Sequence, residues 1–188
     1  INTYKKSEYF KWTGDFISAL IKRSYLNGYN GFNIKTNKNI KSLKTFGAKL
    51  CGTKNNPIEI KLMGDCYKGW FDKARYCDIT FNGNATSCAS EARYSRIVFN
   101  GEAYAESGAY CHYCDITFNG DADQYCADSS WRSKITFKGS ADHCAHWSEE
   151  CELYATDIDV LNEIWLNTAH TSKCYLIEKD GNSREVHF

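Results

Sequence analysis

Four aspartates in the second half of the chain are the residues best suited to catalysis. They are Asp121, Asp123, Asp128 and Asp142. Two carboxyl groups with different pKa values can serve as acid and base on a glycosidic bond, and Asp121 and Asp123 would share one face of a strand because side chains alternate along it. A solvated acidic patch explains the same residues. Since the chain has no G-x-S-x-G, phosphate-loop or H-E-x-x-H motif, a polysaccharide-processing enzyme is the alternative function and not the leading one.

Histidine and cysteine side chains able to bind a metal occur in two clusters. These are His143, Cys144, His146 and Cys151, and, earlier in the chain, Cys111, His112 and Cys114. The repeat described below would place them on different coils and partly on different faces. We therefore expect no metal site and no cofactor.

The ten cysteines are compatible with several chemical states. Their spacings do not reproduce the paired CxxC motifs of zinc knuckles, and several occupy positions that are small in every repeat. This pattern favours buried free thiols. Disulfides between non-equivalent positions, for example at Cys111, remain an alternative.

A third group of residues could bind a ligand without catalysing a reaction or binding a metal. Aromatic side chains recur in segments that vary between otherwise constant phrases, and Tyr and Trp are enriched where proteins bind partners. The candidates are Trp70, Tyr94, Tyr113, Tyr125, Trp131 and Trp147. They could stack on sugar rings or contact a protein, and the alternative is that about half of them pack inside.

The scaffold for these residues is a repeat of 18 or 19 residues. Five phrases share the pattern Ile, then Phe or Leu two positions later, then Gly at the end: 60–64 (IKLMG), 79–83 (ITFNG), 97–101 (IVFNG), 116–120 (ITFNG) and 135–139 (ITFKG). A fixed period of this length indicates a solenoid whose coils stack on one another. We predict a mainly β protein, a parallel β-solenoid with coils of about 19 residues capped by a short helix near each end.

Each part of the phrase has a predicted role. Ile and Phe alternate, so both should point inward and form ladders about 4.8 Å apart. The glycine should supply a positive φ that turns the chain out of the strand. Small residues two positions later, such as Ala103 and Ala122, suit a tight inward corner. Another column, Cys77, Ser95, Cys114, Ser133 and Cys151, places equivalent cysteines two coils apart, too far for disulfides.

The two ends of the chain should protect the terminal coils. Thr13 and Asp15 predict the start of an amphipathic helix, and Asn27-Gly28 its end; its apolar positions are Phe16, Ile17, Leu20 and Ile21. Asp157 predicts the start of a second helix, and the residues around Asp180-Gly181 predict a closing hairpin. The expected parts are therefore an N-terminal cap over 1–31, solenoid repeats over 32–156 and a C-terminal cap over 157–188. No apolar run approaches the roughly 20 residues of a membrane span.

Charge is distributed unevenly although the net charge is zero. Residues 1–75 carry 15 Lys or Arg against 5 Asp or Glu, and residues 76–188 carry 8 against 18. In a solenoid the molecule would have a basic end and an acidic end, which suggests head-to-tail homo-oligomers or filaments, or an oppositely charged partner. No recognised nucleic-acid-binding module accompanies the basic half, so we do not expect nucleic acid as a partner.

Two segments, 74–79 (ARYCDI) and 110–116 (YCHYCDI), resemble shortened repeats of bacterial cysteine-containing leucine-rich-repeat surface proteins. The resemblance covers roughly residues 60–155. The chain lacks that family's proline after the strand, and its period is shorter than the 20–29 residues of leucine-rich repeats, so a parallel β-helix is an equal candidate. The resemblance implies adhesion or ligand binding at a cell or virion surface. The expected function is a non-enzymatic binding or self-assembly module for a protein or glycan partner.

Overall fold

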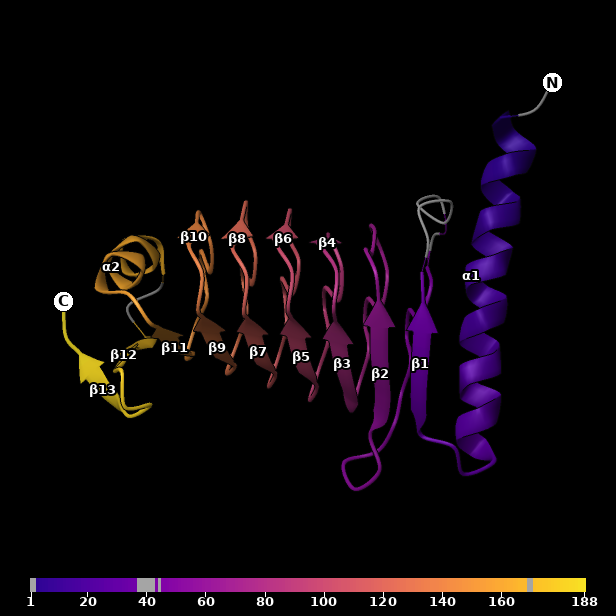
Figure 1. The fold of residues 1–188 in the computed structure, drawn as a ribbon, viewed down its shortest axis with the longest axis horizontal. Coiled ribbons are helices and arrows are strands. Elements are labelled where there is room, and N and C mark those ends of the chain that lie inside the picture. Colours follow the sequence, from indigo (N-terminus) through magenta and orange to yellow (C-terminus); the bar gives the residue numbers. More distant parts are fainter. Residues whose placement is uncertain (1–2, 37–42, 44, 169–170) are drawn as a thin grey trace.

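The computed structural model describes residues 3–36, 43, 45–168 and 171–188. Its elements in chain order are α1 (Thr3–Leu26), β1 (Gly31–Lys35), β2 (Ile58–Met63), β3 (Cys77–Phe81), β4 (Ala85–Thr86), β5 (Arg96–Phe99), β6 (Ala103–Tyr104), β7 (Asp115–Phe118), β8 (Ala122–Asp123), β9 (Lys134–Phe137), β10 (Ala141–Asp142), β11 (Glu152–Ala155), α2 (Ile158–Asn167), β12 (Lys173–Ile177) and β13 (Ser183–Val186). The coils stack from the N-terminal to the C-terminal end as a parallel β-solenoid (Figure 1).

The main wall of the solenoid is a nine-stranded sheet in the order β1-β2-β3-β5-β7-β9-β11-β12-β13. All neighbours are parallel except β12 and β13. The predicted ladders are confirmed: Ile60, Ile79, Ile97, Ile116 and Ile135 pair in register and are buried. Burial of each such side chain contributes roughly 1.5–3 kcal/mol, so this ladder is a main source of stability.

The phenylalanine ladder lies beside the isoleucine ladder. Phe81, Phe99, Phe118 and Phe137 stack with ring centroids 4.9, 4.9 and 5.1 Å apart and their planes within 5° of parallel. None of the four rings is exposed to solvent. Each inner ring therefore loses contacts on both faces if it is removed.

The other walls of each coil are shorter. A second parallel sheet, in the order β10-β8-β6-β4, consists of two-residue strands, and its inward positions are the predicted small residues Ala85, Ala103, Ala122 and Ala141. A third wall has one paired residue per coil, through parallel bridges that connect Arg75, Arg93, His112, Trp131 and Glu149. The corners between walls use residues with positive φ, most of which are not glycine.

The predicted reason for the repeated glycine is wrong at four of its five positions. Only Gly64 has a positive φ, of 113°. A side chain is excluded at Gly83, Gly101, Gly120 and Gly139 because an added Cβ would lie 2.4–2.7 Å from the backbone or a side-chain oxygen of the coil before. Stacking of coils, and not turn geometry, therefore selects glycine at these positions.

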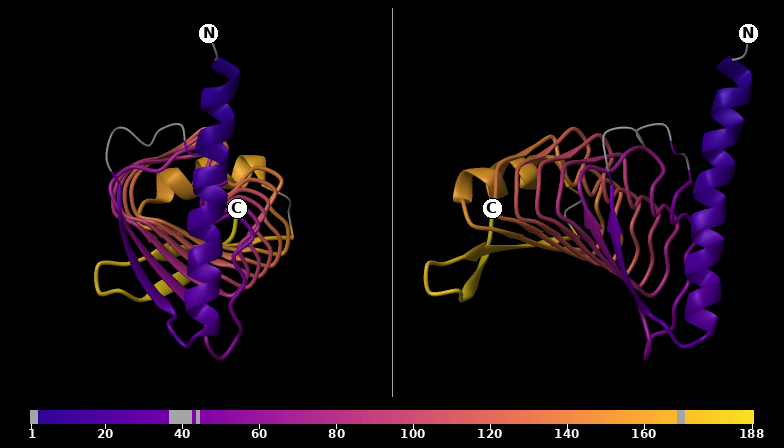
Figure 2. Two further views of the ribbon diagram at one scale, coloured as in Figure 1. Left: turned by 90° about the vertical axis from the view of Figure 1, so that its right-hand side faces the viewer. Right: turned by 45° about the vertical axis from the view of Figure 1, so that its right-hand side comes forward.

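The N-terminal cap is longer than the short helix expected from the sequence. Helix α1 spans 24 residues and does not begin at Thr13. The Asp15 carboxylate instead accepts a hydrogen bond from the Thr45 hydroxyl at 2.8 Å, and the Ser18 hydroxyl accepts one from the Gly47 backbone N–H at 2.8 Å. Because these bonds attach α1 to the first coils, the helix lies across the N-terminal end of the solenoid (Figure 2).

The C-terminal elements agree with the sequence prediction. Asp157 caps α2 by accepting a hydrogen bond from the Asp159 backbone N–H at 2.9 Å. Strand β12 then pairs parallel with β11, so it extends the solenoid sheet, and β13 closes the sheet as an antiparallel hairpin. The degenerate coils expected over 32–50 include β1 and the buried residues Leu43 and Phe46, whereas residues 37–42 and 44 lie outside the described part of the chain.

Candidate binding surface

One of the six aromatic candidates belongs to the core. Trp70 is fully buried, its indole N–H donates a hydrogen bond to the Leu43 carbonyl oxygen at 2.7 Å, and its ring meets Phe46 edge-on at 4.9 Å. Trp70 occupies the same position in its coil as Cys88 and Ser107, which point inward in the following coils. The prediction that Trp70 binds a ligand is therefore wrong, because its place in the coil is an inward one.

Two candidates, Tyr94 and Tyr113, join a third tyrosine in an exposed column. Tyr76 stacks on Tyr94 with centroids 5.2 Å apart, and Tyr94 stacks on Tyr113 at 5.0 Å, with interplanar angles of 10° and 7°. Tyr94 and Tyr113 are 48% and 38% exposed. Tyr76 is not among the six candidates, although steps of 18 and 19 residues separate the three tyrosines and place them in one column.

A corner of the coil holds this tyrosine column in place. Tyr76, Tyr94 and Tyr113 have φ values of 49°, 52° and 56°. Non-glycine residues rarely adopt this left-handed conformation. Here each backbone N–H donates to the next coil: Tyr76 to the Arg93 carbonyl at 3.2 Å, and Tyr94 to the His112 carbonyl at 3.1 Å. The stacked hydrogen bonds fix the three rings on one line.

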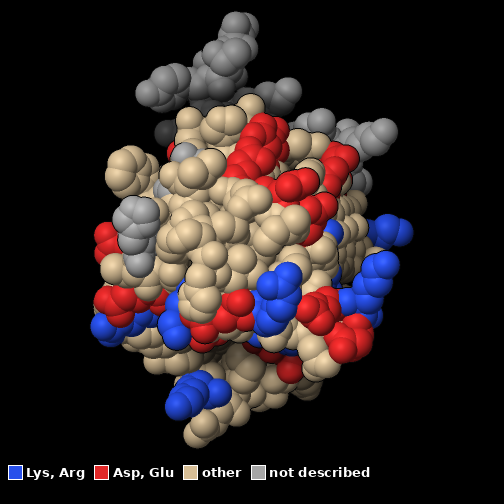
Figure 3. Space-filling model, turned by 90° about the vertical axis from the view of Figure 1, so that its left-hand side faces the viewer, with Lys and Arg blue, Asp and Glu red and all other residues tan. Residues whose placement is uncertain are grey.

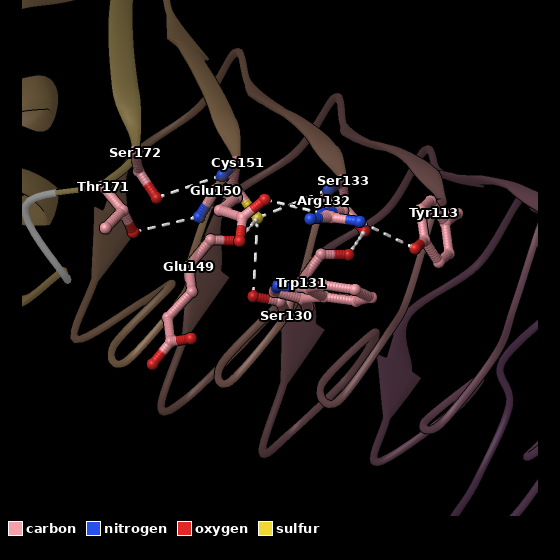
Figure 4. A network of polar contacts seen from close by, with 10 residues as sticks. All are labelled: Tyr113, Ser130, Trp131, Arg132, Ser133, Glu149, Glu150, Cys151, Thr171 and Ser172. Carbon is pink, nitrogen blue, oxygen red and sulfur yellow. Dashed lines mark hydrogen bonds and ion pairs between the residues drawn. The ribbon is translucent and has the colours of Figure 1, made fainter.

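Charged residues continue the column beyond Tyr113 (Figure 4). Arg132 donates from Nη1 to the Tyr113 hydroxyl at 3.2 Å and from Nε to Glu150 at 2.6 Å, and its guanidinium lies 4.1 Å from the centre of the Trp131 ring. The hydrogen bond from Arg132 lowers the pKa of the Glu150 carboxyl. Trp131 is half-buried and meets Tyr113 edge-on at 5.1 Å, so the structure brings this candidate to the end of the tyrosine column.

The remaining two aromatic candidates lie at other phases of the coil. Tyr125 is exposed and meets His146 edge-on at 5.9 Å. Trp147 is 77% exposed and has a positive φ, as does Tyr110 at the equivalent position two coils earlier. Neither forms a ring contact with the tyrosine column in the described part of the chain.

A groove of about 560 Å³ runs beside the tyrosine column. Its walls are Thr53, Lys54, Pro57, Tyr76, Asp78, Tyr94, Ser95, Arg96, Tyr113 and Asp115. The volume lies within the usual range for ligand sites. The loop that forms one end of the groove is closed by backbone hydrogen bonds of 3.1 and 3.2 Å between Thr53 and Asn56.

Charges of alternating sign line one side of the groove. Asp78, Arg96 and Asp115 follow one another in register on β3, β5 and β7, Arg96 forms an ion pair with Asp78 at 3.1 Å, and Lys134 continues the row on β9 outside the groove. The stacked tyrosines cover one another's ring faces, so what they present to a partner is mainly ring edges and hydroxyl groups. The surface therefore combines phenol groups with positive and negative charges, and both recur once per coil.

The four aspartates considered for catalysis do not form one site. Asp121 accepts a hydrogen bond from the Ser140 backbone N–H at 2.9 Å, which lowers the pKa of its carboxyl. Asp128 is buried elsewhere in the coil and accepts one from the His146 backbone N–H at 2.7 Å. Asp123 and Asp142 are neighbours in register on β8 and β10. Asp121 and Asp128 thus accept hydrogen bonds from the backbone of the next coil. Of the four aspartates, only Asp123 and Asp142 are neighbours on paired strands.

No metal site was expected from the sequence, but the structure brings three possible metal ligands together. Asp142, His143 and Glu163 present ligand atoms within 4.8 Å of one another, all on exposed side chains. His143 Nδ1 lies 2.6 Å from the Asp142 carboxylate. The imidazole and the carboxylate are therefore already each other's polar partners.

Comparisons with known proteins give no relative. No protein-family model matches the chain, and neither a curated protein nor a solved structure matches it. None of the helices in the described part of the chain is long and apolar enough to span a bilayer. The function must therefore be argued from the surface itself.

Proposed function

We propose that this chain is a non-enzymatic binding module that recognises a protein partner through the tyrosine column and the groove beside it. The observation that carries the proposal is the stack of half-buried Tyr76 on exposed Tyr94 and Tyr113, which lines a groove of about 560 Å³. Tyrosine provides a rigid apolar body and a hydroxyl group at a low entropic cost. A stack of three at one corner therefore concentrates the side chain most typical of protein recognition sites.

The geometry favours a peptide over a glycan. A sugar ring packs on the face of an aromatic ring, and the faces of Tyr94 are occupied by Tyr76 and Tyr113. Asp78, Arg96 and Asp115 offer both signs of charge along the groove, which suits an extended peptide with mixed charges. We place the partner at a cell or virion surface, as the resemblance to surface repeat proteins suggests.

Two binding screens can decide whether the partner is a protein or a glycan. The purified chain is screened against random linear peptides displayed on phage and against a printed array of glycans. We expect selection of peptides that compete with one another for one site. Glycan binding without selection of any peptide would show that the partner is a glycan and not a protein. Selected peptides that bind equally well to a Tyr94→Ala variant would show that the tyrosine column is not the binding site.

The second candidate function is a polysaccharide-processing enzyme. The observation that favours it is the adjacent pair Asp123 and Asp142, since paired carboxyl groups can divide acid and base roles. Incubation with acidic and neutral polysaccharides, followed by measurement of new reducing ends, tests it. Turnover that disappears in Asp123→Asn would establish the enzyme and displace the binding proposal.

A further inference from the structure

Two buried sulfur atoms in neighbouring coils lie unusually close together. The Sγ atoms of Cys66 and Cys88 are 2.7 Å apart, and both side chains are buried. Non-bonded heavy atoms settle at about 3.5–4.0 Å, whereas a disulfide bond measures about 2.05 Å. The two sulfurs are thus nearer than two packed thiols need to be, and both side chains already point at each other.

The two cysteines come from different positions of adjacent coils. Cys66 pairs with Ala85 in the second sheet, so it occupies the small inward position held by alanine in the later coils. Cys88 occupies the inward position of Ser107, whose hydroxyl accepts a hydrogen bond from the Cys88 backbone N–H at 3.4 Å. A bond between the sulfurs would therefore cross diagonally from one coil to the next.

We propose that Cys66 and Cys88 form a disulfide bond when the chain folds in an oxidising environment. The inference does not depend on the proposed function. With glutathione disulfide as the oxidant, the Cys66 thiolate attacks one sulfur and releases one glutathione thiolate. The Cys88 thiolate then attacks Cys66 Sγ in the mixed disulfide and releases the second. Two protein thiols lose two electrons and two protons, and one glutathione disulfide becomes two glutathione thiols.

Burial decides when the bond forms. It raises the pKa of the Cys88 thiol, and the hydrogen bond with Cys66 raises it further, so in the folded protein the nucleophilic thiolate is scarce. The exchange must occur while the coil is still open. The bond closes a loop that contains Tyr76 and Asp78, two residues of the groove, so it would fix the coil that carries one end of the groove.

The cysteines of a different column cannot form disulfides with one another. Cys77, Cys114 and Cys151 are two coils apart, about 9.6 Å at the usual strand spacing, beyond the 7 Å limit for a disulfide. Serines separate them: the backbone N–H of Cys77 donates to Ser95 Oγ at 3.1 Å, and that of Cys114 donates to Ser133 Oγ at 3.1 Å. Cys77 is therefore a suitable internal control.

Peptide mapping tests the bond directly. The chain is unfolded, reduced and refolded with reduced and oxidised glutathione, and free thiols are alkylated. Digestion with trypsin and Asp-N then separates Cys66 (peptide 65–68), Cys77 and Cys88 (peptide 78–93). We expect one cross-linked species of 65–68 with 78–93 and an alkylated Cys77. Recovery of both peptides separately in alkylated form would overturn the proposal.

The repeat itself supplies matched variants. Cys66→Ala introduces the residue found at Ala85, and Cys88→Ser the residue found at Ser107, so both changes suit the fold. Each should abolish the cross-link, while Cys77→Ser, which copies Ser95, should keep it. Reduction should lower the midpoint temperature of the refolded wild type by roughly 6–12 °C and leave that of Cys88→Ser unchanged. An equal effect on both proteins would also contradict the bond.

Discussion

Gly120 lies against Gly101 with no room for a side chain between the two coils. A Cβ added to Gly120 would meet the Gly101 carbonyl oxygen at 2.6 Å. The same contact recurs between Gly101 and Gly83. The glycine column therefore sets how closely the coils approach one another.

Gly120→Ala should destabilise the protein by about 1–3 kcal/mol, the usual cost of inserting a methyl group where there is no space. Urea unfolding measures the change. Gly31→Ala is the matched control, since nothing lies within 4 Å of its added Cβ, and it should stay within about 0.5 kcal/mol of wild type. An equal loss of unfolding free energy in the two variants would show that close stacking of the coils is not the reason for glycine at these positions.

Phe118→Ala should cost about 3–5 kcal/mol, as expected for a buried aromatic. The ring is stacked between Phe99 and Phe137, so its removal leaves a cavity with two unsupported neighbours. Thr117→Ala, on the outward side of the same strand, should cost much less. A loss below about 1 kcal/mol for Phe118→Ala would mean that the ladder is not a continuous core.

Asp128 should make stability fall as pH rises from about 4 to about 7. Burial raises the pKa of its carboxyl to about 7, whereas in the unfolded chain it is near 3.9. Between these values the folded state keeps a proton that the unfolded chain has released, so raising the pH favours unfolding. Burial also raises the pKa of Asp72, to about 6, with the same sign.

Asp128→Asn removes this penalty and can still accept the His146 backbone hydrogen bond. It should stabilise the protein at pH 8 by up to about 4 kcal/mol, because the pKa differs by about 3 units between the folded and unfolded states and each unit corresponds to 1.36 kcal/mol, and it should have little effect at pH 4. Thermal unfolding across this range measures it. Asp121→Asn is the control with the opposite sign, because the pKa of that carboxyl is lowered in the folded state. Destabilisation by Asp128→Asn at pH 8 would show that the buried carboxylate is needed.

Association should depend on salt if the uneven charge distribution guides assembly. The basic first 75 residues and the acidic remainder lie toward opposite ends of the solenoid (Figure 1). Asp and Glu gather over one side of the C-terminal end, while Lys and Arg mix with them elsewhere on it (Figure 3). Head-to-tail association seen by light scattering at 0.1 M salt should weaken at 1 M, where the Debye length falls from about 10 Å to about 3 Å. A monomer at both salt concentrations and at high protein concentration would contradict assembly through charge.

The sequence determined the scaffold better than the surface. The period placed Ile116 and Phe118 in their ladders because strand alternation and repeat spacing act together on every coil. The start of α1 was missed because Asp15 bonds Thr45, a long-range contact that no local pattern reveals. The residue type of Trp70 suggests a binding aromatic, but its position in the coil, shared with Cys88 and Ser107, is an inward one.

The tyrosine column was only partly predictable. Tyr94 and Tyr113 were chosen as aromatics, but Tyr76 follows from the same 18- or 19-residue step. What the sequence could not give was the stacking of the rings and the groove, because both depend on which corner residues take a positive φ. The sequence does not show which tyrosines adopt a positive φ, because the residue type does not require that conformation.

Isothermal titration of a phage-selected peptide tests the proposed binding surface most directly. Wild type, Tyr94→Ala and Tyr110→Ala are compared. Tyr110 is the matched control because it is 47% exposed and has a φ of 57°, close to the values of Tyr94, but lies in another column. We predict that Tyr94→Ala weakens binding at least about tenfold, equivalent to 1.4 kcal/mol, while Tyr110→Ala leaves it unchanged and both variants keep wild-type stability. Equal affinity of wild type and Tyr94→Ala would contradict the assignment of the tyrosine column as the binding surface.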